Sequence, residues 1–297
     1  MSKVITASLV KELRERTGGG LLECKKVLEE ADGSIEKAIE LMRKSGVAKA
    51  AKKSGRVAAE GIIAVAATDD AKKAMIVEVN CETDFVGRSD DFANFVDLVA
   101  KRALAISAKS IEVLLASNIS DDSDKTIAGE LEALIGKIGE KIAIRRLALF
   151  ESAGIVGSYI HSKRIGVLVN LSVGNAQLGK DIAMHIAASK PLVISSEFLS
   201  KEIVDKEREI YLAQVQSSGK PPEIMQKMVD GKLNKFMEEV TLLKQPFIKD
   251  PSISVGELLK KENAAITEFV RFEVGEGIEK KEVDFATEVM AQVKENE

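Results

Sequence analysis

The residue types that could do chemistry are concentrated at residues 76–86, where the sequence is IVEVNCETDFV. The β-branched residues Ile76, Val77 and Val79 predict a buried strand, and the polar run at 80–84 predicts a turn. Asp84 and Phe85 follow, an acid and a large apolar ring placed so that they can be presented to a partner. The alternative is local: Thr83 or Asp84 caps the next turn, and Phe85 packs beneath it as a staple.

The sequence has few of the residues that hydrolytic catalysis or metal binding usually requires. Only His161 and His185 are available, so a histidine metal site is disfavoured and a serine or cysteine triad has few candidate bases. Cys24 and Cys81 are far apart and lack CxxC spacing. We expect two small buried hydrophobes in a reducing compartment, with no disulfide and no cofactor.

Two glycine-rich stretches resemble phosphate loops. The sequence GNAQLGK at 174–180 fits GxxxxGK, but Asp181 stands where Ser or Thr would ligate magnesium, so we interpret it as a strand-to-helix turn. An enzyme that binds nucleotide there is the alternative. The triple glycine at 18–20 follows no strand and precedes no GK[ST], which favours a turn between helices.

Six basic residues and no acid occur at 43–56. This composition is typical of a solvated linker. The alternative is an RNA-contacting arm that uses Lys49, Lys52 and Lys53, although no aromatic residue is present to stack a base.

The whole chain has 297 residues and a formal net charge of −4, which argues against a general nucleic-acid binder and favours a protein partner. The start shows no secretion signal, and no apolar run approaches membrane-spanning length. We therefore expect a cytoplasmic protein.

Apolar periodicity predicts three short helices in the first 45 residues, a bundle expected to dock rather than catalyse. From residue 61 the apolar residues recur at every second position, which predicts a β-hairpin, and a helical pattern follows it. The same order recurs from residue 154, which indicates a duplicated hairpin-plus-helix unit. Between the copies we expect a helix at about 125–138 and a strand at 141–150.

Two polar helices at 200–216 and 222–240 are predicted to form a projecting antiparallel hairpin. A short helix at 255–261, a strand at 266–274 and a terminal helix at 285–293 are expected after it. The fold class is α+β, and the predicted parts are a UBA-like helical bundle 1–45, a basic linker 46–56, core subdomains 57–140 and 141–199, the inserted helical hairpin 200–241, and the end of the core with a short C-terminal module 242–297.

Five segments carry a resemblance to a known family: LVKELRERTG at 9–18, ECKK at 23–26, VNCETDFV at 79–86, HIAASKP at 185–191 and RFEVGEG at 271–277. In this order they resemble bacterial elongation factor Ts, the guanine-nucleotide exchange factor of elongation factor Tu. The resemblance implies an exchange factor without catalytic residues. Its partner would be elongation factor Tu, both GDP-bound and nucleotide-free, with no membrane and no direct nucleic acid.

The resemblance also implies site residues. Thr83, Asp84, Phe85 and Val86 would enter the GTPase domain near its Mg²⁺ and displace the ion, so that GDP leaves and GTP can bind. Further contacts with the partner would involve Leu21 and Lys25 of the bundle, and Ile248 near the start of the C-terminal module. Ile138, Gly139 and His161 would also contribute, as positions that match the contact surface of the second half of the core and its neighbours. Family members often have methionine where Leu21 and Leu22 stand, and residues 107–126 match no family segment.

Overall fold

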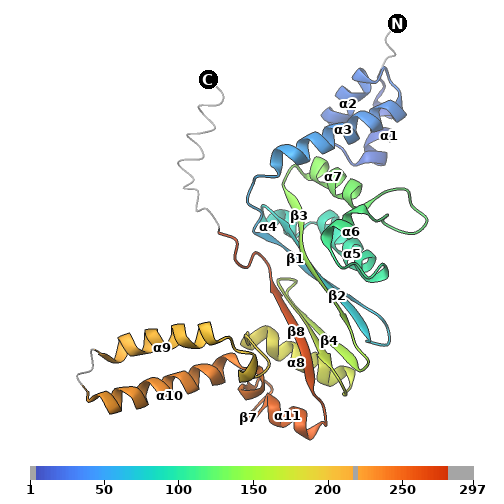
Figure 1. Ribbon diagram of the computed structural model, residues 1–297. Coiled ribbons are helices and arrows are strands. Elements are labelled where there is room, and N and C mark those ends of the chain that lie inside the picture. The colour runs from blue at the N-terminus through green and yellow to red at the C-terminus, as the bar shows by residue number, and fades with distance from the viewer. Residues whose placement is uncertain (1–4, 217–219, 280–297) are drawn as a thin grey trace.

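The protein is elongated, with a helical bundle at one end, two small sheets in the middle and a helical hairpin that projects at the other end (Figure 1). The structure, a computed structural model, describes residues 5–216 and 220–279. Its mixture of helices and separate antiparallel sheets confirms the α+β class. The terminal helix expected at 285–293 lies outside the described residues.

The N-terminal bundle contains α1 (Ala7–Thr17), α2 (Leu21–Glu30) and the start of α3 (Ile35–Lys53). Thr6 and Ser34 cap α1 and α3, since each side chain accepts a hydrogen bond from the first helical turn. Gly18 ends α1 in the left-handed conformation (φ 68°) that glycine adopts without strain. The triple glycine is therefore a turn between helices.

The prediction of a linker at 46–56 is wrong for most of this stretch, because α3 continues to Lys53. Alanine and lysine, which dominate this stretch, are strong helix formers. Gly46 also lets α3 approach α7 (Ile127–Ile138) closely, since a methyl group on Gly46 would lie 3.4 Å from the carbonyl oxygen of Glu132. The bundle is thus joined to the core by a packed helix.

The first sheet has the order β1-β2-β3 and is antiparallel throughout. Its strands are β1 (Glu60–Ala67), β2 (Lys73–Cys81) and β3 (Ile142–Glu151). The boundary expected at 140/141 is therefore wrong, because β3 pairs with β2 and belongs to the first subdomain. An alternating pattern predicts a strand but not its neighbour.

Three helices and a short turn cover this sheet: α4 (Asp84–Gly87), α5 (Asp90–Ala105), α6 (Ile111–Ala116) and α7. Phe92, Val96 and Val99 of α5 are fully buried against Met75, Val77 and Val79 of β2 in one core cluster. The apolar stripe of α5 and the inward face of β2 thus bury each other from water.

The second sheet has the order β4-β5-β8, formed by β4 (Ile155–His161), β5 (Ile165–Leu171) and β8 (Ile266–Glu273). Helix α8 (Ala176–Ser189) covers it. Both sheets consist of a hairpin, a covering helix and a later strand that pairs with the second strand of the hairpin. This shared order is what a duplicated unit would give.

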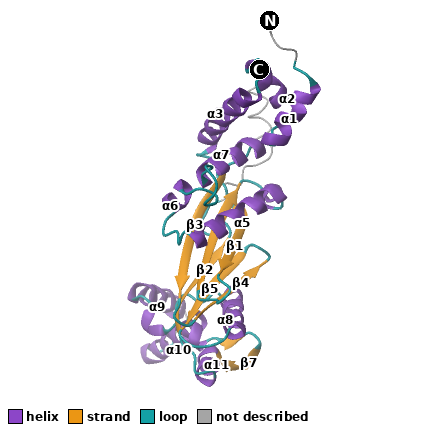
Figure 2. Cartoon of the chain, turned by 90° about the vertical axis from the view of Figure 1, so that its right-hand side faces the viewer, coloured by secondary structure: helices purple, strands orange, loops and turns teal. Residues whose placement is uncertain are grey.

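The two sheets pack face to face, so that the core is layered as helices, sheet, sheet, helix (Figure 2). Ile63 and Ile76 of the first sheet meet Leu168 and Phe272 of the second in a shared cluster. Gly166 allows this approach, since a methyl group there would lie 2.5 Å from Ile63 Cγ2. Each middle strand is therefore buried on both faces.

Glu78 is a fully buried carboxylate at the edge of this layer. It accepts hydrogen bonds from Arg145 Nη1 (3.0 Å), from Arg146 Nε, from Asn80 Nδ2 (3.0 Å) and from the Gly275 amide (2.8 Å). Burial alone would raise the pKa of Glu78, but these hydrogen bonds outweigh it and hold the pKa below its ordinary value. Glu78 thus joins β2 and β3 to the segment that follows β8.

The helical hairpin consists of α9 (Lys201–Gln216) and α10 (Pro222–Val240), which lie side by side and project from the second sheet (Figure 1). Val215, Val229 and Leu233 form its buried seam. Ile203, Ile210 and Ile224 of the same two helices are exposed and lie outside this seam.

Short elements flank the hairpin and complete the second core. They are the 3₁₀ turns at Ser196–Phe198 and Leu242–Lys244, the paired strands β6 (Pro246–Phe247) and β7 (Asp250–Ser254), and α11 (Val255–Lys261). Val255 and Leu259 of α11 pack into the cluster under α8.

Candidate functional site

Thr83 organises the turn between β2 and α4. Its hydroxyl accepts a hydrogen bond from the Val86 amide (3.4 Å) and donates one to Glu140 Oε1 (2.7 Å). Its own amide donates to Glu140 Oε2 (3.0 Å). The capping role expected of Thr83 is therefore confirmed, and it is reinforced by a carboxylate from a distant segment.

Phe85, in contrast, is not a staple. Its side chain is 83% exposed, the largest exposed fraction among the large apolar side chains that the structure describes. Val86 packs partly against the first core, and Asp84 pairs with Arg88 (2.8 Å) on the surface. The local alternative thus holds for the cap but fails for the ring, which points away from the protein.

Cys81 supports the turn from below. Its thiol is buried and donates to the Thr83 carbonyl (3.2 Å). Burial raises the pKa of Cys81 to about 12, and the nearby carboxylates of Glu140 and Glu60 add to the rise. The thiol is therefore a neutral structural group here.

Two chain segments hold each other at this turn. Glu82 accepts from the Lys141 amide (2.6 Å) and pairs with Arg56 (3.3 Å). Glu140, the neighbour of Lys141, binds Thr83, the neighbour of Glu82. The base of α4 is thereby tied on both sides, while Phe85 remains exposed.

Ile138 and Gly139 lie close to this turn, because they immediately precede Glu140. Gly139 ends α7 with φ 85°, and its carbonyl accepts a hydrogen bond from the Lys53 ammonium of α3. Ile138 packs against the first core cluster. Both residues therefore belong to the first core subdomain, since α7 covers the first sheet.

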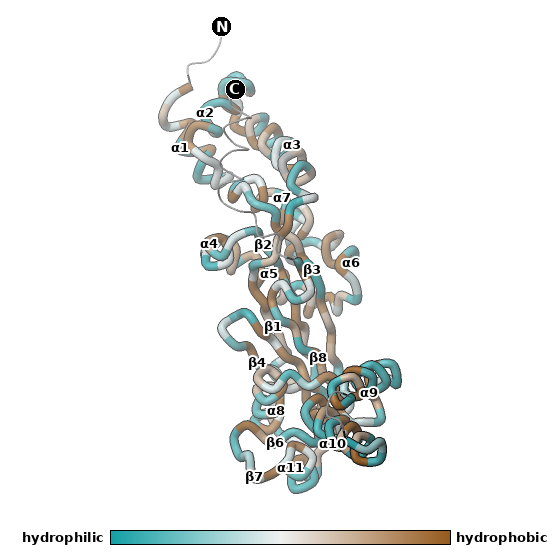
Figure 3. Tube along the Cα trace, turned by 90° about the vertical axis from the view of Figure 1, so that its left-hand side faces the viewer, coloured by the Kyte–Doolittle hydropathy of each residue, from teal (hydrophilic) through white to brown (hydrophobic). Residues whose placement is uncertain are grey.

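Leu21 and Lys25 lie one turn apart on α2, and both side chains are exposed. In Figure 3, α2, α4, and the β6 and β7 pair lie toward the same edge of the elongated molecule. The residues expected to contact a partner are thus spread along the protein rather than gathered in one pocket.

His161 and Ile248 belong to the second half. His161 ends β4 and is exposed, with its Nδ1 3.3 Å from the Tyr159 hydroxyl. Ile248 is 44% exposed between β6 and β7, and its amide donates to Nδ1 of the buried His185 (3.2 Å). His185 Nε2 lies 2.9 Å from Gln245 Oε1 and donates to it, because Nδ1 is the acceptor. Burial lowers the pKa of His185, which favours this neutral form.

Glu140 is the residue of this turn that sequence reasoning does not identify. The only local signal is an acid directly after a helix-ending glycine, and nothing in the spacing indicates that it reaches Thr83, 57 positions away in the chain.

The stretch at 174–181 does not form a phosphate loop. Asn175 caps α8, so residues 176–181 are already helical, and a Cβ on Gly179 would lie 2.9 Å from the Cα of Gly157. Gly179 is needed for this close packing of α8 on β4, which confirms a strand-to-helix turn.

The basic stretch is also engaged within the protein. Lys44 pairs with Glu40 (2.7 Å), Lys53 binds the Gly139 carbonyl, and Arg56 pairs with Glu82. Of the three lysines of the RNA-contacting alternative, Lys53 is therefore used to hold the end of α7.

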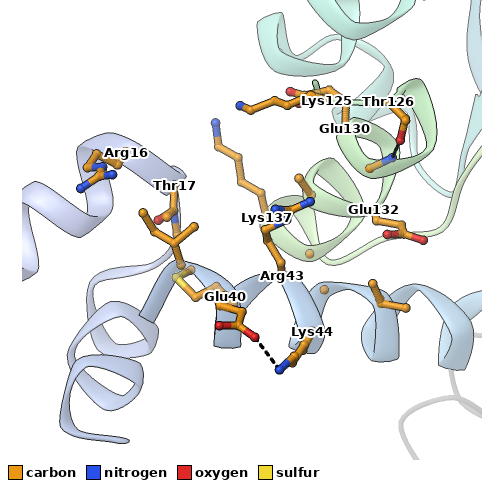
Figure 4. A pocket seen from close by; sticks show the side chains of 18 of the residues that line it. Arg16, Thr17, Glu40, Arg43, Lys44, Lys125, Thr126, Glu130, Glu132 and Lys137 are labelled. Atoms are coloured by element: carbon orange, nitrogen blue, oxygen red, sulfur yellow. Dashed lines mark hydrogen bonds and ion pairs between the residues drawn. The ribbon is translucent and has the colours of Figure 1, made fainter. Parts of the chain in front are cut away.

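A cleft of 650 Å³ lies between the bundle and α7. Lys125 and Lys137 extend toward the same space, while Glu40 and Lys44 pair on the other side of α3 (Figure 4). The charged residues that line the cleft have both signs, with Glu23, Glu130 and Glu132 among the acids.

Within residues 5–216 and 220–279, no cluster of three or more His, Cys, Asp or Glu side chains is arranged to hold a metal ion. None of the helices in these ranges has both the length and the apolar composition that crossing a membrane requires.

Comparison with known proteins gives one family. A sequence profile described as "Elongation factor TS" matches residues 82–276. A protein of Methylococcus capsulatus named "Elongation factor Ts" is 56% identical over 291 residues, which cover 98% of this chain and 99% of that protein. Proteins with the same name from Legionella pneumophila and Hydrogenovibrio crunogenus are 53% and 50% identical, over 98% and 97% of this chain and 99% and 97% of their own lengths.

Proposed function

The chain belongs to the elongation factor Ts family, and from this premise we propose that it releases GDP from elongation factor Tu by inserting Phe85 beside the Mg²⁺ site of that GTPase. Family membership makes it a translation elongation factor of protein biosynthesis, with the exchange role on Tu that the family implies. The observation that carries the finer proposal is an exposed aromatic ring on a turn that is fixed on both sides.

The physical argument concerns charge. Mg²⁺ neutralises the phosphates of the bound nucleotide, so that disturbing its ligands weakens nucleotide binding. Exchange is a thermodynamic coupling between two ligands of the GTPase, the nucleotide and the exchange factor. A protein that binds the empty GTPase better than the GDP-bound one lowers the affinity for GDP by the same factor. Phe85 would act as the apolar wedge, and Asp84 would act by hydrogen bonding or repulsion. Thr83 would set their direction, and Val86 would anchor the turn to the core.

Such a role needs no general acid, base or nucleophile, and we propose that the protein is not a catalytic enzyme. Leu21 and Lys25, with the C-terminal module beginning near Ile248, would grip the nucleotide-binding domain from outside. His161 would contact another domain of the partner, and Ile138 and Gly139 would contribute beside the wedge. A task in translation elongation also supports the expected cytoplasmic location.

We also propose a revised division of the chain. The bundle includes α3 to Lys53, and the first core unit runs from Glu60 through β3. The second unit begins at β4 and is completed by β8, with the helical hairpin inserted between α8 and β8.

The test is the release of fluorescent GDP from elongation factor Tu, with Phe85→Ala and Phe198→Ala compared with the native protein. Phe198 is the matched control, since it is 68% exposed in the 3₁₀ turn before α9. Truncating a central aromatic contact typically removes 2 kcal/mol or more, so Phe85→Ala should slow release by at least about tenfold while Phe198→Ala does not. Release that the native protein leaves unchanged would overturn the proposal.

The two alternative functions, nucleotide binding at 174–181 and RNA binding by the basic stretch, are tested by direct binding measurements. Binding of labelled GDP or RNA by the isolated protein would support them, with Lys52→Ala and Lys53→Ala together as the variant for RNA.

A further inference from the structure

Helix α4 cannot fix its own direction. It has four residues, and its backbone is closed mainly by the bonds from Gly87 to Thr83 and from Arg88 to Asp84. A single turn gains little from its internal hydrogen bonds, because the first turn costs the most conformational entropy. The direction of Phe85 must therefore come from the groups that hold the start of the helix.

Glu140 holds that start with two hydrogen bonds. Its two oxygens accept from the amide and from the hydroxyl of Thr83, at 3.0 and 2.7 Å. The hydroxyl, fixed in this way, keeps its lone pair toward the Val86 amide (3.4 Å). Because the acceptor is a carboxylate, both bonds are charge-assisted and stronger than those of a neutral group.

Glu140 is itself well placed to resist movement. It follows Gly139, whose carbonyl is bound by Lys53 of α3, and it precedes Lys141, whose amide binds Glu82. The link from α3 through Gly139 and Glu140 to Thr83 is thus continuous, and α3 carries the bundle with Leu21 and Lys25.

We propose that Glu140 is a positioning residue for nucleotide exchange, which directs Phe85 by holding both the amide and the hydroxyl of Thr83. The inference rests on the proposed function, since it assigns the direction of the same wedge. Glu140 does not need to touch the partner. Its removal changes how often Phe85 points outward in the productive direction, and therefore the maximal rate of GDP release rather than the concentration that gives half of it.

The experiment compares Glu140→Ala, Glu140→Gln, Phe85→Ala and the double variant Phe85→Ala/Glu140→Ala in full-length protein. Glu268→Ala is the matched control, because Glu268 is exposed on β8 of the second sheet. Fluorescent GDP release is measured over a range of concentrations of each variant, and urea unfolding checks that each one is folded.

Loss of two charge-assisted bonds should lower the maximal rate by about tenfold in Glu140→Ala. Glu140→Gln keeps a carbonyl acceptor and should lose about threefold. Glu268→Ala should match the native protein. The double variant should be as slow as Phe85→Ala alone, because a residue that acts through Phe85 has nothing left to direct.

Three results would overturn the inference. A native maximal rate for both Glu140 variants would show that Thr83 needs no such support. Losses that multiply in the double variant would show that Glu140 acts apart from Phe85. If the native protein does not accelerate release at all, the proposed function fails and the inference fails with it, whereas a defect confined to Phe85→Ala removes the inference alone.

Discussion

Gly46 of α3 and Gly136 of α7 pass each other so closely that a methyl group on Gly136 would lie 3.3 Å from the Cα of Gly46. This crossing joins the N-terminal bundle to the first sheet. Because neither residue has a side chain, the two backbones approach without an intervening layer.

Gly136→Leu should therefore push α3 away from α7. Overpacking of a tight contact typically costs about 1–3 kcal/mol, so the free energy of unfolding in urea should fall by that amount. Gly231→Leu is the control, since a Cβ atom at Gly231 of α10 would meet nothing within 4 Å. Equal stability of the two variants would mean that the crossing is looser than the distances indicate.

Glu78→Gln should lower the free energy of unfolding by about 2 kcal/mol at pH 7, because the charge that faces Arg145 and Arg146 is lost. The pKa of Glu78 is lower when folded than when unfolded. Its stabilising contribution is therefore present above the ordinary value of 4.5 and is lost as the pH falls through the folded pKa.

The difference between native protein and Glu78→Gln should accordingly shrink below about pH 4.5. Urea unfolding at several pH values measures it, with Glu268→Gln as an exposed control. A difference that stays constant down to pH 3 would contradict the ionised buried carboxylate.

Asp84→Asn should separate function from stability. The Asp84 to Arg88 pair is exposed, and such pairs contribute less than about 1 kcal/mol, so urea unfolding should change little. GDP release from elongation factor Tu should nevertheless slow several-fold if Asp84 acts on the partner.

Arg88→Ala breaks the same ion pair and leaves Asp84 in place. It should keep the native release rate. If both variants slow release equally, the ion pair rather than the free carboxylate is what matters.

Cys81 should be almost unreactive in the folded protein. A pKa of about 12 leaves very little thiolate at pH 8, and the thiol is also buried beneath α4. A Cys24→Ala variant leaves Cys81 as the single thiol for reaction with a chromogenic disulfide reagent. The reaction should be slow without urea and fast in urea, and a fast reaction without urea would show that α4 opens readily.

The sequence predicted local structure well where periodicity or capping decides it. The capping preference of threonine predicts a cap at Thr83, and apolar periodicity predicts a helix after the first hairpin; both are present. Pairing between distant segments could not be predicted, because strand alternation does not identify a neighbour. For this reason the sequence does not predict that β3 pairs with β2, or that Glu140 reaches Thr83.

The extent of α3 could have been predicted, since its alanines and lysines favour a helix, but the density of charge suggested a linker. The type and position of Phe85 single it out in the sequence. They do not predict whether its ring is buried or exposed, because a ring that packs beneath the turn and a ring that is presented to a partner have the same sequence pattern.

The late position of β8 has a consequence for synthesis. During translation the first sheet can close once β3 has left the ribosome, whereas β5 has an open edge until Ile266 emerges, after the entire helical hairpin. Open strand edges promote misassociation, so the second half of the nascent chain is the part exposed to it for longer. Thr83, Phe85 and Glu140 all belong to the half that is completed first.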